Sequence, residues 1–187
     1  MQIIPLESAT GVLIIPVAVH HAADLASLVQ QNIEHLRTYL PAVADLSTAE
    51  AATNHLLAAE QRAASGEIFE WHLFVDDTLC GSVRLKDIDQ GDRKAKIGYF
   101  IGIQFAGRGI VTSAVRAVLA YCFGPLGLNR IELRCESGNQ RSKRVAERLG
   151  FVHEGLLRQD EFLNGAFVDL HVYGLLGADF NANEIAS

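Results

Sequence analysis

The chain has 187 residues, 49% of them hydrophobic, and a formal net charge of −6. This length and apolar fraction are sufficient for one domain with a well-buried core. The negative charge and the lack of any basic block argue against nucleic acid as a direct partner.

The cysteines and the apolar runs indicate the compartment. Cys80, Cys122 and Cys135 are odd in number and widely spaced inside apolar stretches. This pattern predicts buried free thiols in a reducing compartment, not a disulfide framework or a metal site. The sequence begins without a signal peptide, and its longest apolar run, near residues 114–123, carries Arg116 and is too short to span a bilayer. We expect a soluble, cytoplasmic protein with no membrane partner.

The first 66 residues predict a strand and two helices. An apolar run at residues 12–17 predicts the opening strand. Apolar residues at helical spacing predict one helix from His21 to Leu40, ended by Pro41. Ser47-Thr48-Ala49-Glu50 has the spacing of a capping box, and it begins an alanine-rich helix that Gly66 should end.

The following elements are mostly strands. Two apolar runs at residues 69–75 and 80–85 bracket a short polar turn and predict a hairpin. A polar turn is predicted at residues 87–92. The remaining predicted elements are a strand at 97–101, a helix at 110–123, a strand at 131–135, a helix at 142–148, and closing strands near 152–157 and 167–175. No repeat or linker interrupts this order, so we predict the α+β class, with one domain over residues 1–187 around a mixed sheet.

The run Gln104-Phe105-Ala106-Gly107-Arg108-Gly109 joins a predicted strand to a predicted helix that begins at Ile110. Its two glycines allow successive backbone N–H groups to point into one concavity, with no Cβ in the way. The helix that follows adds unpaired N–H groups and the positive end of its dipole. The loop therefore predicts a backbone cradle for the pyrophosphate of a nucleotide-containing cofactor.

Two common cofactor loops do not fit. A P-loop needs a lysine after its last glycine, and none follows Gly109. A Rossmann fingerprint starting at Gly107 would need a third glycine where Thr112 stands. Nucleoside triphosphate hydrolysis and dinucleotide binding are therefore disfavoured.

Q-x-x-G-x-G after a strand is typical of the GNAT-type N-acetyltransferases, which this chain resembles over most of its length. Downstream, Asn139-x-x-Ser142 followed by Leu149-Gly150-Phe151 is similar to the RimJ/RimL-like branch, which acetylates ribosomal-protein N-termini. The stretches from Asn32 to Pro41 and from Glu161 to Tyr173 are also similar to that branch.

The resemblance implies a mixed, mostly antiparallel central sheet flanked by helices, with splayed central strands, and acetyl-CoA as co-substrate. His20-His21 shows no metal-ligand spacing with other residues, so no metal site is predicted. The residues expected to contact the cofactor are Ile101, Ile103, Gln104, Phe105, Ala106, Gly107, Arg108, Gly109, Ile110, Asn139 and Ser142.

Acetyl transfer to an amine needs a neutral nucleophile. An α-amino group has a pKa near 7.7–8.0, against about 10.4 for lysine, so a protein N-terminus needs less help from a base. Many family members carry a glutamate where this chain has Lys96. The resemblance therefore assigns the base to Glu161; the alternatives are a water, or a solvated loop carboxylate with no role.

The leaving thiolate needs stabilisation. Ser142, at a helix start, is the candidate donor; the alternative is an ordinary N-cap. Tyr173 is the second candidate acid, or else an inward-facing aromatic residue. His171 shares its face, and His35 is a candidate acceptor contact. Backbone N–H groups near residues 101–103 are expected to stabilise the oxyanion.

Two function classes stay open. The first is an acetyl-CoA-dependent N-acetyltransferase acting in a ternary complex on a protein N-terminus or on a small-molecule amine. The second is a non-catalytic acyl-CoA-binding module, which Lys96 favours and which Ser142, Glu161 and Tyr173 disfavour. A homodimer is expected only because symmetric dimers are common.

Overall fold

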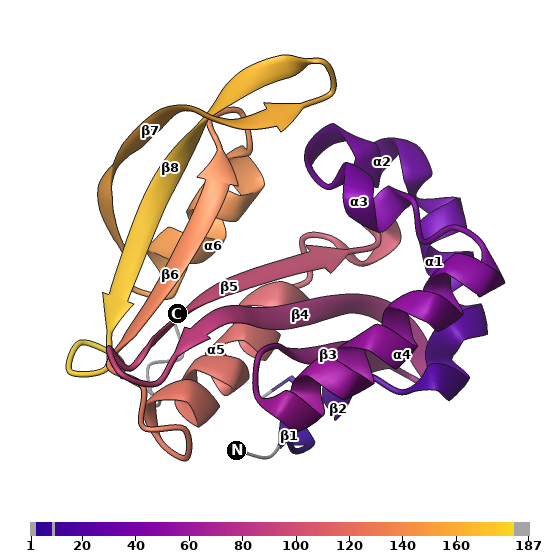
Figure 1. The fold of residues 1–187 in the computed structure, drawn as a ribbon, viewed down its shortest axis with the longest axis horizontal. Helices are drawn as coiled ribbons and strands as arrows, with labels where there is room; N and C mark the ends of the chain where they lie inside the picture. Colours follow the sequence, from indigo (N-terminus) through magenta and orange to yellow (C-terminus); the bar gives the residue numbers. More distant parts are fainter. Residues whose placement is uncertain (1–2, 9, 182–187) are drawn as a thin grey trace.

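The computed structural model describes residues 3–8 and 10–181. Its centre is an eight-stranded sheet in the order β1-β2-β3-β4-β5-β6-β8-β7 (Figure 1). The β5–β6 pair is parallel and the other neighbouring pairs are antiparallel, so the mixed, mostly antiparallel sheet is confirmed. The strands are β1 (Leu6–Glu7), β2 (Leu13–Pro16), β3 (Phe69–Val75), β4 (Thr78–Asp89), β5 (Lys94–Ile101), β6 (Arg130–Glu136), β7 (Val152–Leu163) and β8 (Ala166–Leu176).

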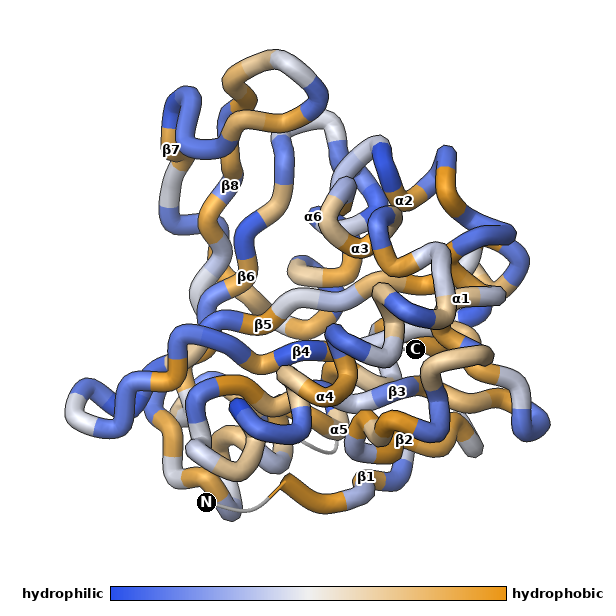
Figure 2. Tube along the Cα trace, turned by 45° about the vertical axis from the view of Figure 1, so that its right-hand side comes forward, coloured by the Kyte–Doolittle hydropathy of each residue, from blue (hydrophilic) through white to orange (hydrophobic). Residues whose placement is uncertain are grey.

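Helices cover both faces of the sheet. They are η1 (Val19–His21), α1 (Ala22–Gln31), α2 (Ile33–Tyr39), α3 (Pro41–Ala44), α4 (Ala49–Ser65), η2 (Ile103–Phe105), α5 (Ile110–Phe123) and α6 (Gln140–Arg148). One apolar cluster joins α5 and α6 to strand residues such as Trp71 and Leu133, and a second joins α1 and α4 to Phe74 and Phe100. In Figure 2 hydrophilic segments occur at several turns and also along strands and helices, such as β4 and α2. Alternating strand residues therefore supply two cores, one on each face.

The sheet splits between β5 and β6. These strands pair only from Lys94 to Ile97 and from Arg130 to Leu133. Beyond that point β5 continues to Ile101 and β6 to Glu136 without pairing to each other, and Figure 1 shows them diverging. Because backbone groups on the facing edges have no ladder partner there, this split is where an extended ligand can lie.

The predicted helix from His21 to Leu40 is wrong as one element. It breaks at Asn32, whose φ is −124°. The Asn32 side chain donates to the Leu28 carbonyl at 2.8 Å and accepts from the Ile103 N–H at 2.7 Å, so it takes over bonds that a continuous helix would not make. The predicted stop before Pro41 is confirmed, because α2 ends at Tyr39 with Leu40 as its cap. Pro41 then begins α3, a position that suits its missing N–H.

Caps and strand ends differ by small amounts from the predictions. Thr48, not Ser47, caps α4 by accepting from the Ala51 N–H at 3.2 Å, and Gly66 ends that helix as expected, with a φ of 76°. Asn139, not Ser142, caps α6. The predicted polar turn at 87–92 is partly wrong because β4 runs to Asp89.

The closing strands are longer than predicted and end in a tight turn. β7 includes Glu161 and runs to Leu163, so Glu161 is a strand residue and not a loop residue. Asn164 and Gly165, with φ of 50° and 86°, join β7 to β8. Asn and Gly are the residues that tolerate such a two-residue hairpin turn.

The cysteines are buried and free, as predicted. Within residues 3–8 and 10–181, no helix is long and apolar enough to cross a membrane, and no cluster of potential metal-binding side chains occurs.

Candidate active site

The glycine loop after β5 has the backbone geometry of an anion cradle. Gly107 and Gly109 have φ of 79° and 75°, in the left-handed region that disfavours a side chain. A Cβ at either position would meet no heavy atom within 4 Å, so open space lies in front of both residues. Gly109 precedes the first turn of α5 with no side-chain cap.

The N–H groups of this loop are free to bind a ligand. Across the part of the chain that the structure describes, no acceptor is bonded to the backbone N–H groups of residues 107–112. These N–H groups lie at the positive, N-terminal end of the α5 dipole. The Arg108 guanidinium lies over the Phe105 ring, 5.7 Å from its centroid. An exposed row of donors beside a cation fits a pyrophosphate, so the residues present fit coenzyme A.

The expected oxyanion donors at residues 101–103 are mostly occupied. The Gly102 N–H donates to the Cys80 carbonyl at 2.8 Å, and the Ile103 N–H donates to Asn32. Two of the N–H groups in the range expected to stabilise the oxyanion are therefore already bonded within the protein. Ile101 lies opposite Gly81, one step along the antiparallel ladder from the bonded Gly102, so its N–H and C=O point away from β4 and into the split.

Ser142 lies across the split. It is the third residue of α6, and its backbone N–H donates to the Asn139 Oδ1 at 3.1 Å. Its Oγ lies 2.9 Å from the Tyr99 hydroxyl of β5. Burial raises the pKa of the Cys135 thiol on β6, and a hydrogen bond from Ser142 partly offsets that increase. Ser142 thus contacts Tyr99 on β5 and lies near Cys135 on β6, at the split between the two strands.

Sequence reasoning had given Tyr99 no role. Alternation along β5 puts it on the same face as Ile97, toward α5 and α6, which was visible in the Ile97-Gly98-Tyr99 run. Its partner Ser142 lies 43 residues away, and no local pattern indicates that contact. Burial is the main cause that raises the pKa of Tyr99.

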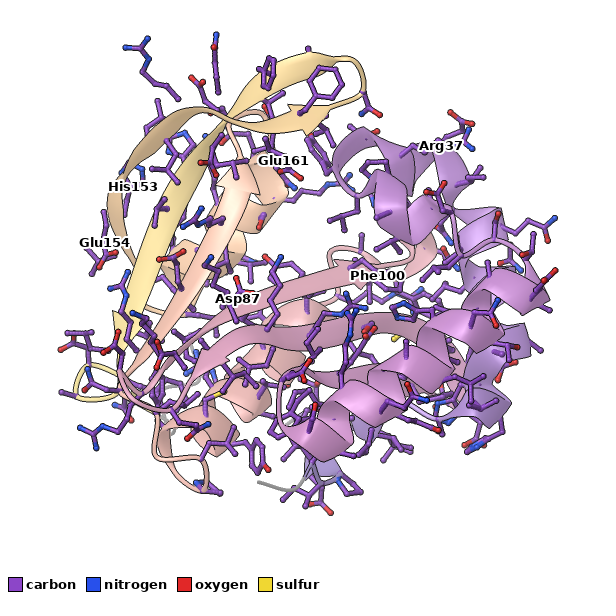
Figure 3. All side chains as sticks on the ribbon, viewed as in Figure 1. Arg37, Asp87, Phe100, His153, Glu154 and Glu161 are labelled. Atoms are coloured by element: carbon purple, nitrogen blue, oxygen red, sulfur yellow. The ribbon has the colours of Figure 1, made fainter. Side chains whose placement is uncertain are left out.

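Glu161 is placed by the β7–β8 hairpin. It is exposed, lies opposite Val168, and in Figure 3 projects toward the space between that hairpin and α2. The hairpin is tied to α2 because the Asn164 side chain donates to the carbonyls of Arg37 and Thr38, at 3.0 and 3.2 Å. Glu161 is therefore held at the edge of the space above the split, on a different element from Ser142.

Tyr173 occupies a core position. It is 4% exposed and lies opposite Leu133, at the last level where β5 and β6 still pair. Its ring contacts those of His153 and His171, at 5.1 and 6.3 Å, so the predicted shared face of His171 and Tyr173 is confirmed. Burial raises the pKa of Tyr173. These contacts favour the packed-aromatic interpretation over the acid.

The other expected side chains fall in separate places. Lys96 makes an ion pair with Asp87 at 2.9 Å and faces Glu132 of β6, so no base stands at that position. His35 lies on α2; burial lowers its pKa first, and the nearby charge of Arg141 on α6 adds to this. The side chains of His35 and Arg141 are therefore near enough to interact electrostatically.

Known proteins resemble this chain in sequence and in fold. A family model described as the acetyltransferase (GNAT) domain matches residues 12–152. YdaF of Bacillus subtilis (strain 168), provisionally described as a ribosomal N-acetyltransferase, is 36% identical over 164 residues, covering 87% of this chain and 90% of YdaF. The ribosomal-protein-serine acetyltransferase of Escherichia coli (strain K12) is 35% identical over 101 residues, 54% of this chain and 56% of its own.

One solved structure similar to this chain contains a bound cofactor. The microcin C7 self immunity acetyltransferase MccE, in complex with acetyl-CoA and AMP, is 26% identical. It superposes with a TM-score of 0.83, covering 88% of this chain and 92% of MccE.

Proposed function

The chain belongs to the GNAT acetyltransferase family, whose members are acetyl-CoA-dependent N-acetyltransferases, and we propose that its acceptor is a protein N-terminus. The first candidate is the N-terminus of a ribosomal protein. Two relatives described as acting on ribosomes or ribosomal proteins support this acceptor. The non-catalytic acyl-CoA-binding alternative is not favoured.

The observation that carries the proposal is the placement of Ser142 and Glu161 on two different elements, α6 and β7, of the β6-β8-β7 half of the fold. Ser142 contacts Tyr99 of β5 across the split, whereas Glu161 projects from the hairpin that Asn164 ties to α2. An amine that enters between the hairpin and α2 would meet Glu161 before it meets the split. A narrow, extended chain terminus suits such an entrance.

Acetyl-CoA, when bound, supplies the acetyl group as a thioester. The N–H groups of residues 107–110 would hold its pyrophosphate, and the backbone of Ile101 and Asn139 would line the rest of the slot. Glu161, directly or through water, would take the proton of an α-amine whose pKa is close to neutral. Ser142 would donate a hydrogen bond to the sulfur as it leaves.

Two further parts of the proposal concern the whole protein. We place the enzyme in the cytoplasm, where a ribosomal acceptor occurs and where its three free cysteines stay reduced. A homodimer stays a prediction, with symmetric association as its only support.

The first experiment measures CoA thiol release from acetyl-CoA with a panel of acceptors. The panel contains peptides with free serine or alanine N-termini, the same peptides with a blocked N-terminus and an internal lysine, polyamines, amino acids and aminoglycosides. We expect release with the free N-termini alone. Release with only the small amines would reject the protein acceptor and keep the acetyltransferase.

Glu161→Gln tests the base. Loss of a general base is expected to lower kcat/KM by roughly a hundred-fold or more, while acetyl-CoA affinity stays unchanged. The matched control is Glu7→Gln, an exposed strand glutamate on β1 at the opposite edge of the sheet. If Glu161→Gln turns over peptides as fast as the Glu7→Gln control, the base lies elsewhere.

A further inference from the structure

The hydroxyl of Ser142 has two neighbours, one on each diverging strand. The Tyr99 phenol on β5 lies 2.9 Å from Ser142 Oγ, and on the β6 side Ser142 is close enough to the Cys135 thiol to lower its pKa. The backbone of Ser142 is fixed separately, because its N–H donates to Asn139. The side-chain oxygen is therefore held at one point, and only the direction of its proton is undetermined.

The chemistry of the two hydroxyls decides that direction. A phenol is far more acidic than an aliphatic alcohol, so in a Tyr–Ser pair the phenol is the better donor and the serine oxygen the better acceptor. Burial raises the pKa of Tyr99, so the phenol keeps its proton throughout the working range. Ser142 then accepts from Tyr99, and its own single proton must point elsewhere.

The remaining direction leads to sulfur. With the lone pair on the β5 side occupied by Tyr99, the Ser142 O–H is left to bond on the β6 side of the split, where Ser142 already lowers the pKa of Cys135. A thioester sulfur lying between the strands would take that bond in place of the protein thiol. The Tyr99–Ser142 pair therefore differs from a purely structural contact, because it leaves the Ser142 O–H available to donate to a ligand in the split.

We propose that Tyr99 is a positioning residue, which donates to Ser142 and thereby aims the Ser142 proton at the sulfur that leaves during acetyl transfer. This inference rests on the role of Ser142 in the proposed function. When the carbon–sulfur bond breaks, its electron pair stays on sulfur, and the Ser142 O–H stabilises that thiolate by a hydrogen bond. Tyr99 and Ser142 both keep their protons, and the amine proton leaves through Glu161.

A purely structural pair makes a different prediction. If Tyr99 only packs β5 against α6, its loss lowers stability but leaves the bound thiol untouched. If it aims Ser142, removing either hydroxyl weakens the same bond to sulfur, and removing both does no further harm. The double variant therefore separates the two interpretations.

The test measures the pKa of the CoA thiol in the binary complex, with no acceptor present. The thiolate is followed by ultraviolet absorbance, as the difference between the CoA complex and the desulfo-CoA complex, so that the protein cysteines cancel. Tyr99→Phe and Ser142→Ala should each reduce the bound thiolate fraction by about three- to tenfold at a given pH, and the double variant should match Ser142→Ala. In turnover, kcat should fall by a similar factor with KM for acetyl-CoA unchanged.

The matched control is Tyr121→Phe. Tyr121 is also a buried tyrosine, packed on Trp71 at 5.9 Å, and this change should leave the bound thiol at its wild-type pKa. A Tyr99→Phe complex with the wild-type thiol pKa would overturn the inference, and so would an additive loss in the double variant. Ser142→Ala with an unchanged thiol pKa would overturn it too, but peptide acetylation by the wild-type enzyme, measured separately, would leave the acceptor proposal standing.

Discussion

At the residue scale, the cofactor loop depends on two positions where a side chain is excluded. Gly107 and Gly109 combine a left-handed backbone with open space in front of the residue. Other exposed glycines, such as Gly127, share both features, so these features alone do not mark a ligand site. The pair is distinguished by its place between β5 and α5, beside backbone N–H groups that have no acceptor among the described residues.

Gly107→Asp should abolish cofactor binding. The new carboxylate would stand in the cradle and repel the pyrophosphate in a partly desolvated loop, with an expected loss of several kcal/mol of acetyl-CoA affinity, on the order of a hundred-fold or more in Kd. Titration calorimetry with CoA measures it. Gly127→Asp is the control, because Gly127 also has a positive φ, 63°, with nothing within 4 Å, but lies after α5. Equal CoA affinity in the two variants would contradict the cradle.

The sequence predicted these glycines but not their partners. Q-x-x-G-x-G is a local pattern, and local patterns carry local backbone geometry. The bonds from Asn32 to Ile103 and from Tyr99 to Ser142 join residues 71 and 43 positions apart. Nothing in the composition near Asn32 or Tyr99 indicates those contacts.

At the scale of elements, α2 is held at both ends by asparagine side chains. Asn32 connects its start to the cofactor loop, and Asn164 connects its end to the hairpin that carries Glu161. Carbonyl groups in the last turn of a helix have no hydrogen-bond partner within that helix. The Asn164 amide therefore donates to carbonyls of α2 that would otherwise be unpaired. The cofactor loop and the proposed base are thus joined through one short helix.

Asn164→Gly tests this connection. Glycine keeps the left-handed turn, where Asn164 has a φ of 50°, and removes only the amide. We expect KM for the peptide acceptor to rise about three- to tenfold, as one or two hydrogen bonds are lost, with CoA affinity unchanged. Asp77→Gly is the control, since Asp77 has a φ of 57° in the β3–β4 turn. If both variants keep the wild-type KM, the tie has no part in acceptor binding.

Most of the longer helices and strands were predicted with the right type, whereas several of their ends and the short elements β1 and α3 were not predicted. Period and caps mark where α5 begins and ends, so its range of 110–123 matched. The sequence did not predict the break at Asn32, because asparagine is tolerated in helices. The side chain of Asn32 bonds to Ile103, which lies far away in the sequence. The extension of β7 to Leu163 escaped because its exposed polar residues resemble a loop, whereas pairing with β8 makes them a strand.

At the scale of the whole molecule, the α1–α4 face of the sheet contains buried ionisable groups that set the acid stability. His72 on β3 is fully buried; burial lowers its pKa to about 3, and its Nδ1 lies 3.1 Å from that of His21 on η1. Nearby, Glu70 is paired with Arg84 at 2.6 Å and lies 3.3 Å from His55. Although burial raises its pKa, these partners together lower it to about 2.

Both shifts destabilise the fold in acid. Below pH 6.5 the unfolded chain protonates at the position of His72 and the folded chain does not, so stability falls from pH 6.5 toward pH 3. Glu70 adds a loss between pH 4.5 and pH 2, because its folded pKa is depressed. The His72 contribution is on the order of several kcal/mol when complete.

His72→Leu should therefore flatten the stability profile between pH 6.5 and pH 4.5. Within the described residues His72 Nε2 has no hydrogen-bond partner, so leucine leaves no donor unpaired there, at the cost of about 1 kcal/mol for the His21 contact. Urea unfolding at a series of pH values measures it. The exposed His20→Leu is the control. A variant profile as steep as that of the control would show that His72 does not govern the acid loss.

The sequence by itself indicated the α+β class, the order of the longer elements, the glycine loop before α5 and the family resemblance, because each depends on periodicity, caps or a short motif along the chain. That residues 1–187 form one domain, and the Glu161 and Ser142 roles, stay predictions. Only the tertiary structure showed that β5 and β6 stop pairing after Ile97 and Leu133 and that Ser142 contacts Tyr99 at this split. It also showed that hydrogen bonds from the side chains of Asn32 and Asn164 connect the two ends of α2 to other elements. These features are contacts between distant segments, whose energies exist only once the sheet has brought the segments together.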